Sequence, residues 1–366
     1  MIIDLHAHLP MSLPLPEAPQ DSIATHELQR LLLKLMSSAL NEHHGHPRVT
    51  VENIKEGGVA ALGSVLYNPA DEFQLGHDPG KYSFAHTLIQ IDEVEQAVKD
   101  TCGLAVMRNP RELEACLVKG EQALFHCVEG GFCIENDAGH ATELARRGIA
   151  YVIVAHLFFK NIATCNNAIP FIADEVFARI NNQPTNKGLT EIGHQLVETL
   201  FKEHVIVDVT HCSDLAINDI FALRASKREY GEAVIISSHT GVRSRSNHPL
   251  NLSSDTVDRI VDSGGVIGVI FYPYWLIPES ESERKRNRLQ QVAETIDCIH
   301  AQVGNYDHIA IGTDLAGFIR PIKECPTMAN IQAVEDFITQ RYGLPIAEKI
   351  LWNNVLQTLQ RGWQGI

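Results

Sequence analysis

Short apolar segments alternate along this chain with longer amphipathic ones. Eight of the apolar segments have strand length, and most of them are rich in valine and isoleucine. Strands that are covered on both faces have this composition, which is typical of parallel sheets. The predicted strands are Ile2–His6, Val59–Tyr67, Gln122–Cys127, Ala150–Val154, Val205–Val209, Val234–Ser238, Gly265–Ile270 and Ile309–Gly312.

The segments between these strands carry apolar residues with the 3.6-residue period of amphipathic helices. Helices are predicted at Ile91–Thr101, Asp137–Arg147, Glu191–Glu203, Asp255–Ser263 and Leu289–Val303. Eight strand–helix units in one chain favour an α/β fold of the (β/α)8, TIM-like barrel type over an open sheet.

Two segments interrupt the alternation. Residues 10–47 begin with several prolines and contain a helical pattern at His26–Leu40, so we interpret them as an insertion that shapes the mouth of a pocket. The charge run Glu279–Arg288 is typical of a solvated loop or helix start, with a mobile lid as the alternative. Since no repeat or linker divides the chain, residues 1–366 are expected to form a single domain.

The overall composition excludes several classes of protein. The chain is 45% hydrophobic and 20% charged, which is typical of a soluble globular protein. Its net charge of −15 argues against a nucleic-acid partner and against an anionic membrane surface. The first nine residues lack the features of a cleavable signal peptide, and no apolar run has the length of a membrane span. A cytoplasmic location is therefore expected.

Polar side chains with metal-binding or catalytic chemistry lie at the ends of most predicted strands. His6 and His8 are two positions apart, so in a strand they point to the same side. The C-terminal ends of barrel strands form one ring around the active site. The residues that would face this ring are His6, His8, Glu129, His156, His211, His239 and Asp314.

Imidazoles and a carboxylate in this arrangement suit a pair of divalent cations. Four imidazoles and one carboxylate can hold two ions about 3.5–4 Å apart, with the carboxylate bridging them. Glu129 is the natural bridge, because it offers two oxygens. Asp314 at the last strand would take a proton from water activated by the ions and pass it to a leaving group.

Several of these residues have a plainer interpretation when they are taken alone. A histidine after a strand, such as His156, is more often a hydrogen-bonded structural residue than a ligand. Asp4 and Asp208 would either orient metal ligands or be paired elsewhere. The aromatic side chains near residue 275 would either line a pocket or pack in the core, and they are Tyr272, Tyr274 and Trp275.

Short motifs from end to end of the chain resemble those of one enzyme family. They are Glu56–Ala60 (EGGVA), Gln90–Asp92 (QID), Val128–Gly131 (VEGG), Ser238–His239 (SH), His248–Pro249 (HP) with Asn251–Leu252 (NL), Gly264–Val269 (GGVIGV), Phe271–Pro273 (FYP), Ile311–Asp314 (IGTD) and the helix Lys349–Leu359. In this order they resemble the renal, or membrane, dipeptidase family of zinc peptidases, which belongs to the amidohydrolase superfamily of metal-dependent barrels.

The resemblance implies a role for each residue of the ring. His6 and position 8 would bind the first metal, Glu129 would bridge, and His211 and His239 would bind the second metal. His156 would contact the substrate and polarise the scissile carbonyl, and Asp314 would be the general acid/base. The implied cofactors are two divalent ions, with zinc expected. The implied partner is a small-molecule dipeptide or related amide, attacked by a metal-bridging hydroxide, and the family often forms homodimers.

Three positions depart from the family pattern. His8 stands where the family has an aspartate, which leaves the centre with more positive charge. Leu250 replaces an arginine that grips the substrate's carboxylate, and Ala316 replaces a second acid. Leucine cannot form a bidentate clamp, and the spacing does not place the nearby Arg243 or Arg245 in the site. We therefore predict that the hydrolytic machinery is retained while dipeptide recognition is weakened or redirected.

Two other functions stay open from the sequence. A metal-dependent phosphoesterase is one, because the opening Asp4–His8 motif also begins such barrels, although the VEGG and GGVIGV motifs speak against it. A barrel that binds metal without turnover is the other, supported by Leu250 and Ala316. Against it, every metal-ligand and proton-transfer position of the motifs holds a competent side chain.

Overall fold

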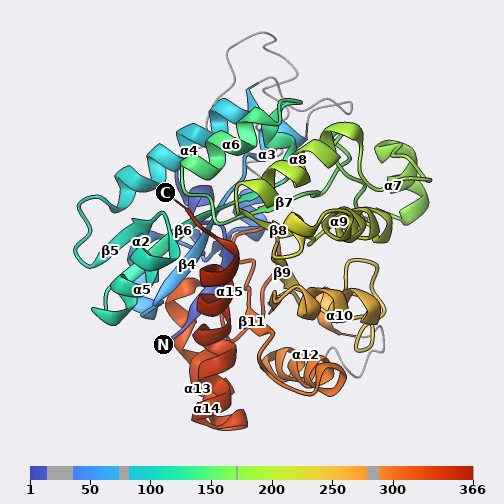
Figure 1. Ribbon diagram of the computed structural model, residues 1–366. Coiled ribbons are helices and arrows are strands. Elements are labelled where there is room, and N and C mark those ends of the chain that lie inside the picture. Colours follow the sequence, from blue (N-terminus) through green and yellow to red (C-terminus); the bar gives the residue numbers. More distant parts are fainter. Residues whose placement is uncertain (15–35, 74–81, 170–171, 278–287, 366) are drawn as a thin grey trace.

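The computed structural model describes residues 1–14, 36–73, 82–169, 172–277 and 288–365, and its centre is a closed barrel of eight parallel strands (Figure 1). Each strand pairs in parallel with its neighbours, and the ring closes through the pairings of β1 with β11 and of β4 with β6. The eight strands are β1 (Ile3–Ala7), β4 (Ala61–Leu66), β6 (Gln122–Glu129), β7 (Tyr151–Ile153), β8 (Ile206–Asp208), β9 (Ile235–Thr240), β10 (Ile267–Val269) and β11 (Ile309–Ile311). The predicted (β/α)8 barrel is confirmed.

One strand of the sheet lies outside the ring and was not predicted. Strand β5 (Leu104–Met107) pairs with the first half of β6, from Gln122 to Phe125. The last three residues of β6 pair instead with β7. The β5 sequence LAVM is apolar but only four residues long, and in the structure Ala105 is exposed and the two residues after it are half-buried.

The longer helices pack around the outside of the barrel (Figure 1). They are α4 (Ser83–Val98), α5 (Pro110–Val118), α6 (Gly139–Arg146), α8 (Glu191–Lys202), α9 (Asp214–Ser226), α10 (Ser254–Asp262), α12 (Arg288–Val303), α13 (Gln332–Tyr342) and α15 (Asn354–Gly362). Thr190, Ser213 and Ser253 each begin one of these helices by accepting a hydrogen bond from a backbone N–H of its first turn.

Shorter helices and a hairpin fill the connections. The helices are α2 (Val51–Gly57), α3 (Pro69–Glu72), α7 (Asp174–Asn181), α11 (Pro273–Leu276) and α14 (Leu344–Glu348), and the hairpin joins β2 (Glu42–His43) to β3 (His46–Pro47). The predicted helix His26–Leu40 lies outside the described residues except for its helical end at 36–40. The charge run Glu279–Arg288 also lies outside them, apart from Arg288, which begins α12.

Close backbone contacts hold the strands that carry the site. A Cβ atom added to Gly268 of β10 or to Gly312 after β11 would lie 1.8 Å from the Ser238 carbonyl oxygen. Only glycine permits this approach, which brings β9 against its neighbours next to His239.

Among the described helices, none combines the length and the apolar character that a membrane crossing requires.

Candidate metal centre

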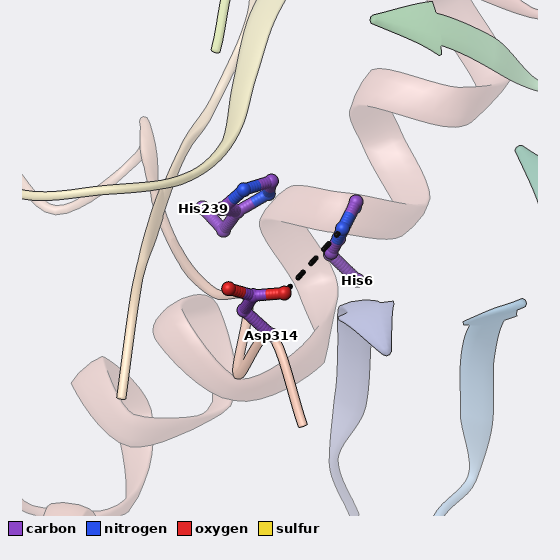
Figure 2. Close-up of side chains that lie close together, drawn as sticks. All are labelled: His6, His239 and Asp314. Carbon is purple, nitrogen blue, oxygen red and sulfur yellow. Dashed lines mark ion pairs between the residues drawn. The ribbon is translucent and has the colours of Figure 1, made fainter. Parts of the chain in front are cut away.

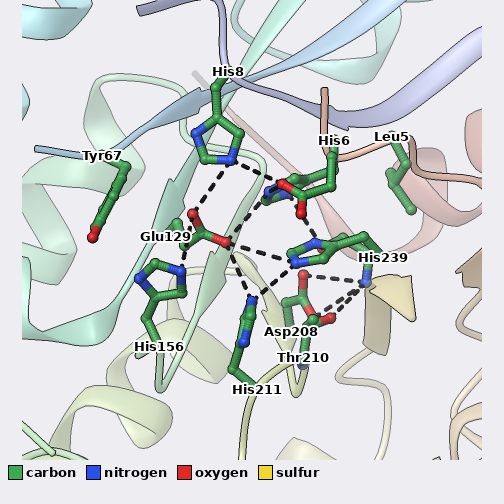
Figure 3. Close-up of polar contacts among 12 residues, drawn as sticks. Leu5, His6, His8, Tyr67, Glu129, His156, Asp208, Thr210, His211 and His239 are labelled. Carbon is green, nitrogen blue, oxygen red and sulfur yellow. Dashed lines mark hydrogen bonds and ion pairs between the residues drawn. The ribbon is translucent and has the colours of Figure 1, made fainter. Parts of the chain in front are cut away.

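A buried carboxylate lies at the centre of the C-terminal rim of the barrel (Figure 3). Glu129 ends β6, and the Nε2 atoms of five histidines surround its two oxygens. Three of them face Oε1 at 3.4, 3.6 and 3.8 Å, namely His6, His211 and His239. Two face Oε2 at 3.4 and 3.5 Å, namely His8 and His156. The structure therefore brings all of the predicted imidazoles to one carboxylate.

Several polar atoms of this cluster are buried and have no hydrogen-bond partner among the described residues. His6 Nε2 and Glu129 Oε1 are buried and form no hydrogen bond to the described residues. Such atoms are unfavourable unless something else binds them. Burial lowers the pKa of His6 to about 4, and it also lowers the pKa values of His211 and His239. These three rings are therefore neutral and offer the lone pair that a metal requires.

The spacing of the donor atoms suits small cations. The Nε2 atoms of His211 and His239 are 3.0 Å apart. One ion bound by two imidazoles at about 2.0–2.1 Å would hold their nitrogens roughly 3.3 Å apart at a tetrahedral angle. Three buried triads have ligand atoms that all lie within 4.8 Å of one another, namely His6–His239–Asp314, His6–His8–Glu129 and Glu129–His156–His211. The residues present therefore fit divalent ions.

Hydrogen bonds on the far sides of the rings orient two of them. The Tyr151 hydroxyl donates to the Leu5 carbonyl at 2.8 Å, so its oxygen accepts from His6 Nδ1 at 2.9 Å. His239 Nδ1 lies 3.0 Å from Ser238 Oγ. These contacts use the Nδ1 atoms and leave both Nε2 atoms directed toward the centre, as outer partners of metal-bound histidines do.

Asp4 of β1 and Asp208 of β8 accept hydrogen bonds from backbone N–H groups beside the histidine cluster. Asp4 accepts hydrogen bonds from Thr313 N at 2.9 Å and Oγ1 at 2.6 Å, which ties β1 to the residue before Asp314. Asp208 accepts from Thr210 N at 2.8 Å and also from Ser238 N, which ties β8 to β9. Of the two interpretations left open by the sequence, the orienting one agrees with these contacts.

Asp314 lies beside His6 of β1 (Figure 2), and its backbone adopts a strained conformation. Its Oδ1 is 3.2 Å from His8 Nε2 and 3.9 Å from His6 Nε2. Burial raises the pKa of Asp314 to about 6, although the hydrogen bond with His8 opposes this shift. Both Asp314 and His211 have positive φ, at 57° and 68°, a conformation that side chains other than glycine adopt at a cost and often at functional sites.

The family of the chain follows from a comparison that spans this whole architecture. Residues 1–362 match the model of the membrane dipeptidases, peptidase family M19. The chain belongs to this family. The predicted resemblance is thereby confirmed, and the M19 motifs coincide with the strand ends that form the centre.

Individual relatives in this family are distant. The chain is similar to dipeptidase verJ of Clonostachys rogersoniana, with 24% identity over 274 residues, or 73% of this chain and 63% of that protein. It thus spans less than two thirds of this relative. Two solved structures share the fold: dipeptidase AC (TM-score 0.72, 19% identity, 99% and 98% of the two chains covered) and a Rhodobacter sphaeroides metallopeptidase (0.73, 17%, 99% and 99%). The latter was solved with a phosphinate mimic of the dipeptide L-Ala-D-Ala.

Sequence reasoning missed several residues of this M19 centre. Glu72 is fully buried, and its Oε2 lies 2.6 Å from His156 Nδ1. Tyr67 and Tyr151 also contact histidines of the cluster. Glu72 belongs to a four-residue helix after β4, where no periodicity marks a site. Tyr67 directly follows β4, so the strand-end rule that found Glu129 could have found it.

Leu250, where the sequence predicts a departure from the family pattern, has no free arginine beside it among the described residues. Leu250 is buried, and both nearby arginines are held by other groups. Arg243 forms a bidentate pair with Asp214 at 2.8 Å, and Arg245 pairs with Glu294. Both guanidinium groups are thus paired with carboxylates.

An aromatic side chain lies beside the centre instead. The ring of Trp275 lies 5.7 Å from the ring of His211 and stacks 6.3 Å from that of His239. His248 stacks on it in turn at 6.0 Å. Trp275 is buried, so it forms part of the wall beside the two histidines, while Tyr274 is exposed.

Proposed function

We propose that this protein is a metal-dependent hydrolase that cleaves dipeptides or related amides and works with two divalent ions, zinc foremost. The observation that carries the proposal is the Glu129 carboxylate with five imidazole nitrogens within 3.8 Å. Such a set of donors, shared by the two oxygens of one buried carboxylate, suits a pair of ions.

The family resemblance implies how the donors divide. His6 and His8 would hold the first ion, His211 and His239 the second, and Glu129 both. Burial would lower the pKa of His156, but Glu129 and Glu72 raise it to about 9. The family resemblance assigns His156 to the substrate, and a protonated ring would agree with this role because it cannot bind a metal.

When bound, the ions would lower the pKa of coordinated water toward about 7 and polarise the scissile carbonyl. The chain's own residues would supply the remaining functions. His156 Nε2–H would donate to the substrate carbonyl. Asp314, whose pKa is raised only to about 6, would be mostly ionised near neutral pH, so it would take up a proton from the attacking water and deliver it to the leaving amine.

The substrate is expected to differ from an ordinary dipeptide at its carboxylate end. Leu250 replaces the carboxylate-binding arginine, and Arg243 and Arg245 are engaged by Asp214 and Glu294. A panel of dipeptides, N-acyl amino acids and amides, assayed with zinc or manganese, would test this expectation. Efficient cleavage of ordinary dipeptides that depends on their free carboxylate would overturn it.

Metal analysis and one substitution test the proposal as a whole. Asp314→Ala should lower the rate by orders of magnitude while the protein keeps its metal ions. Cleavage of a generic phosphodiester, without cleavage of any amide, would favour the phosphoesterase alternative. Two bound ions with no turnover on any substrate would favour a barrel that only binds metal.

Other properties of the protein stay predictions. They are the identity and number of the ions, the single-domain organisation of residues 1–366, the cytoplasmic location and the homodimer.

A further inference from the structure

The short helix α3 presents two successive buried carboxylates to two different histidines. Asn68 caps this helix by accepting a hydrogen bond from Ala70 N, and Pro69 opens it. Asp71 lies 2.8 Å from Nδ1 of His86, which belongs to α4. The next residue, Glu72, lies 2.6 Å from His156 Nδ1. The first pair anchors α3 to α4, and the second reaches the metal centre.

Both oxygens of Glu72 are fully used. Oε2 accepts from the Tyr67 hydroxyl at 2.8 Å as well as from His156. Oε1 accepts from Phe158 N at 2.9 Å. A carboxylate without solvent exposure needs such donors in order to stay ionised. Burial alone would raise the pKa of Glu72, but His156 and the other donors lower it.

The hydrogen bond from His156 decides which ring nitrogen faces the centre. An ionised carboxylate only accepts hydrogen bonds, so Nδ1 of His156 carries a hydrogen. Nε2 is then the atom directed toward Glu129, 3.5 Å from its Oε2. The ring is also enclosed at its sides, since the rings of Tyr67 and His211 meet it edge-to-face at 4.7 Å each (Figure 3).

We infer that Glu72 is a positioning residue for hydrolysis, which holds the His156 ring with Nε2 turned into the metal centre through the hydrogen bond from Nδ1. Glu72 makes its contacts on the side of the ring away from Glu129, so it acts through His156. The inference rests on the proposed function for what Nε2 then does to a substrate. Outer-shell partners of this kind commonly contribute about 10–100-fold.

A pair of neighbouring substitutions separates this role from a structural one. Glu72→Gln leaves one acceptor oxygen, which cannot serve both Phe158 N–H and His156 Nδ1–H. Asp71→Asn is the matched control, because it neutralises the same kind of carboxylate beside an imidazole on the same helix, but at His86. We expect kcat/KM to fall about 10–100-fold in Glu72→Gln, with unchanged metal content, and to stay near the wild-type value in Asp71→Asn. Glu72→Asp, which keeps the charge, should restore part of the loss.

Proton NMR reports the contact without any assay of activity. Each carboxylate-bound Nδ1 proton should give a low-field resonance, assigned by its loss in His156→Ala or His86→Ala. Glu72→Gln should remove the His156 resonance and keep that of His86, whereas Asp71→Asn should keep the His156 resonance. A His156 resonance that persists unchanged in Glu72→Gln would overturn the inference. If the wild-type enzyme hydrolyses no amide, the proposed function falls, while the resonance still decides whether Glu72 holds the ring.

A double substitution completes the test. If Glu72 acts through His156, Glu72→Gln should cause no further loss of activity in a His156→Ala background. Losses that multiply independently, or an equal loss in Asp71→Asn, would show that α3 matters only for stability and would overturn the inference.

Discussion

Gly317 lies against the carboxylate of Asp314, so one added methyl group would test how closely that carboxylate must be placed. A Cβ atom at Gly317 would lie 1.8 Å from Asp314 Oδ1 and 2.8 Å from His8 Nε2. Gly317 is not among the glycines with positive φ, so alanine would not strain its backbone. The substitution therefore acts on the neighbouring side chains rather than on the loop.

The size of the effect follows from the distance. Ordinary contact with a Cβ atom begins at 3.4 Å, so the Asp314 carboxylate must move by more than 1 Å. A misplacement of about 1 Å can lower a rate by about 100-fold, or roughly 2.7 kcal/mol of activation free energy. The end of a side chain can turn away at a cost of about 0.5–1.5 kcal/mol, so the free energy of unfolding should change by no more than this.

The assay compares kcat, KM, metal content and urea unfolding for the wild type, Gly317→Ala and a control. Gly139→Ala serves as the control, because a Cβ atom there meets nothing closer than Asp137 Oδ1 at 3.0 Å. We expect kcat to fall about 100-fold in Gly317→Ala alone, with the metal retained. A wild-type kcat in a folded, metal-loaded Gly317→Ala protein would refute the reasoning. A loss that follows metal content would instead place the effect at His8.

Two further substitutions probe Tyr151, which contacts His6 of the histidine cluster, and His126, a buried histidine outside that cluster. Tyr151→Phe removes the acceptor for His6 Nδ1, so metal affinity measured against a competing chelator should fall about 10–100-fold, with Tyr230→Phe as a control that keeps wild-type affinity. Burial, together with Arg108 and Arg147, lowers the pKa of His126 to about 3. Below pH 6.5 the unfolded chain binds a proton at His126 that the folded chain does not, so the free energy of unfolding falls by up to about 1.4 kcal/mol for each pH unit by which the pH is lowered. In metal-free protein, the free energy of unfolding of the wild type should fall by about 2 kcal/mol more than that of His126→Leu when the pH is lowered from 7 to 5, as measured by urea unfolding. Equal changes in the two proteins would contradict this.

The pattern of apolar and polar positions along the chain was sufficient to predict the barrel and the polar residues that gather at the C-terminal ends of its strands. Apolar periodicity records which segments are buried, and parallel strands that close into a barrel must bring their C-terminal ends together. Residues as distant in sequence as His6, Glu129 and Asp314 could therefore be placed at one centre. Strand β5 was not predicted from its four apolar residues, and in the structure it lies outside the closed barrel and is partly exposed.

Only the tertiary structure decided what surrounds and orients that ring. Glu72 and Tyr151 reach the histidines from other elements, across 84 and 145 residues of sequence. The direction of Arg243, the wall formed by Trp275 and the space beside Gly317 likewise depend on packing. The physical reason is that periodicity reports burial along one element, whereas a hydrogen bond joins two elements whose distance is set only when the barrel closes.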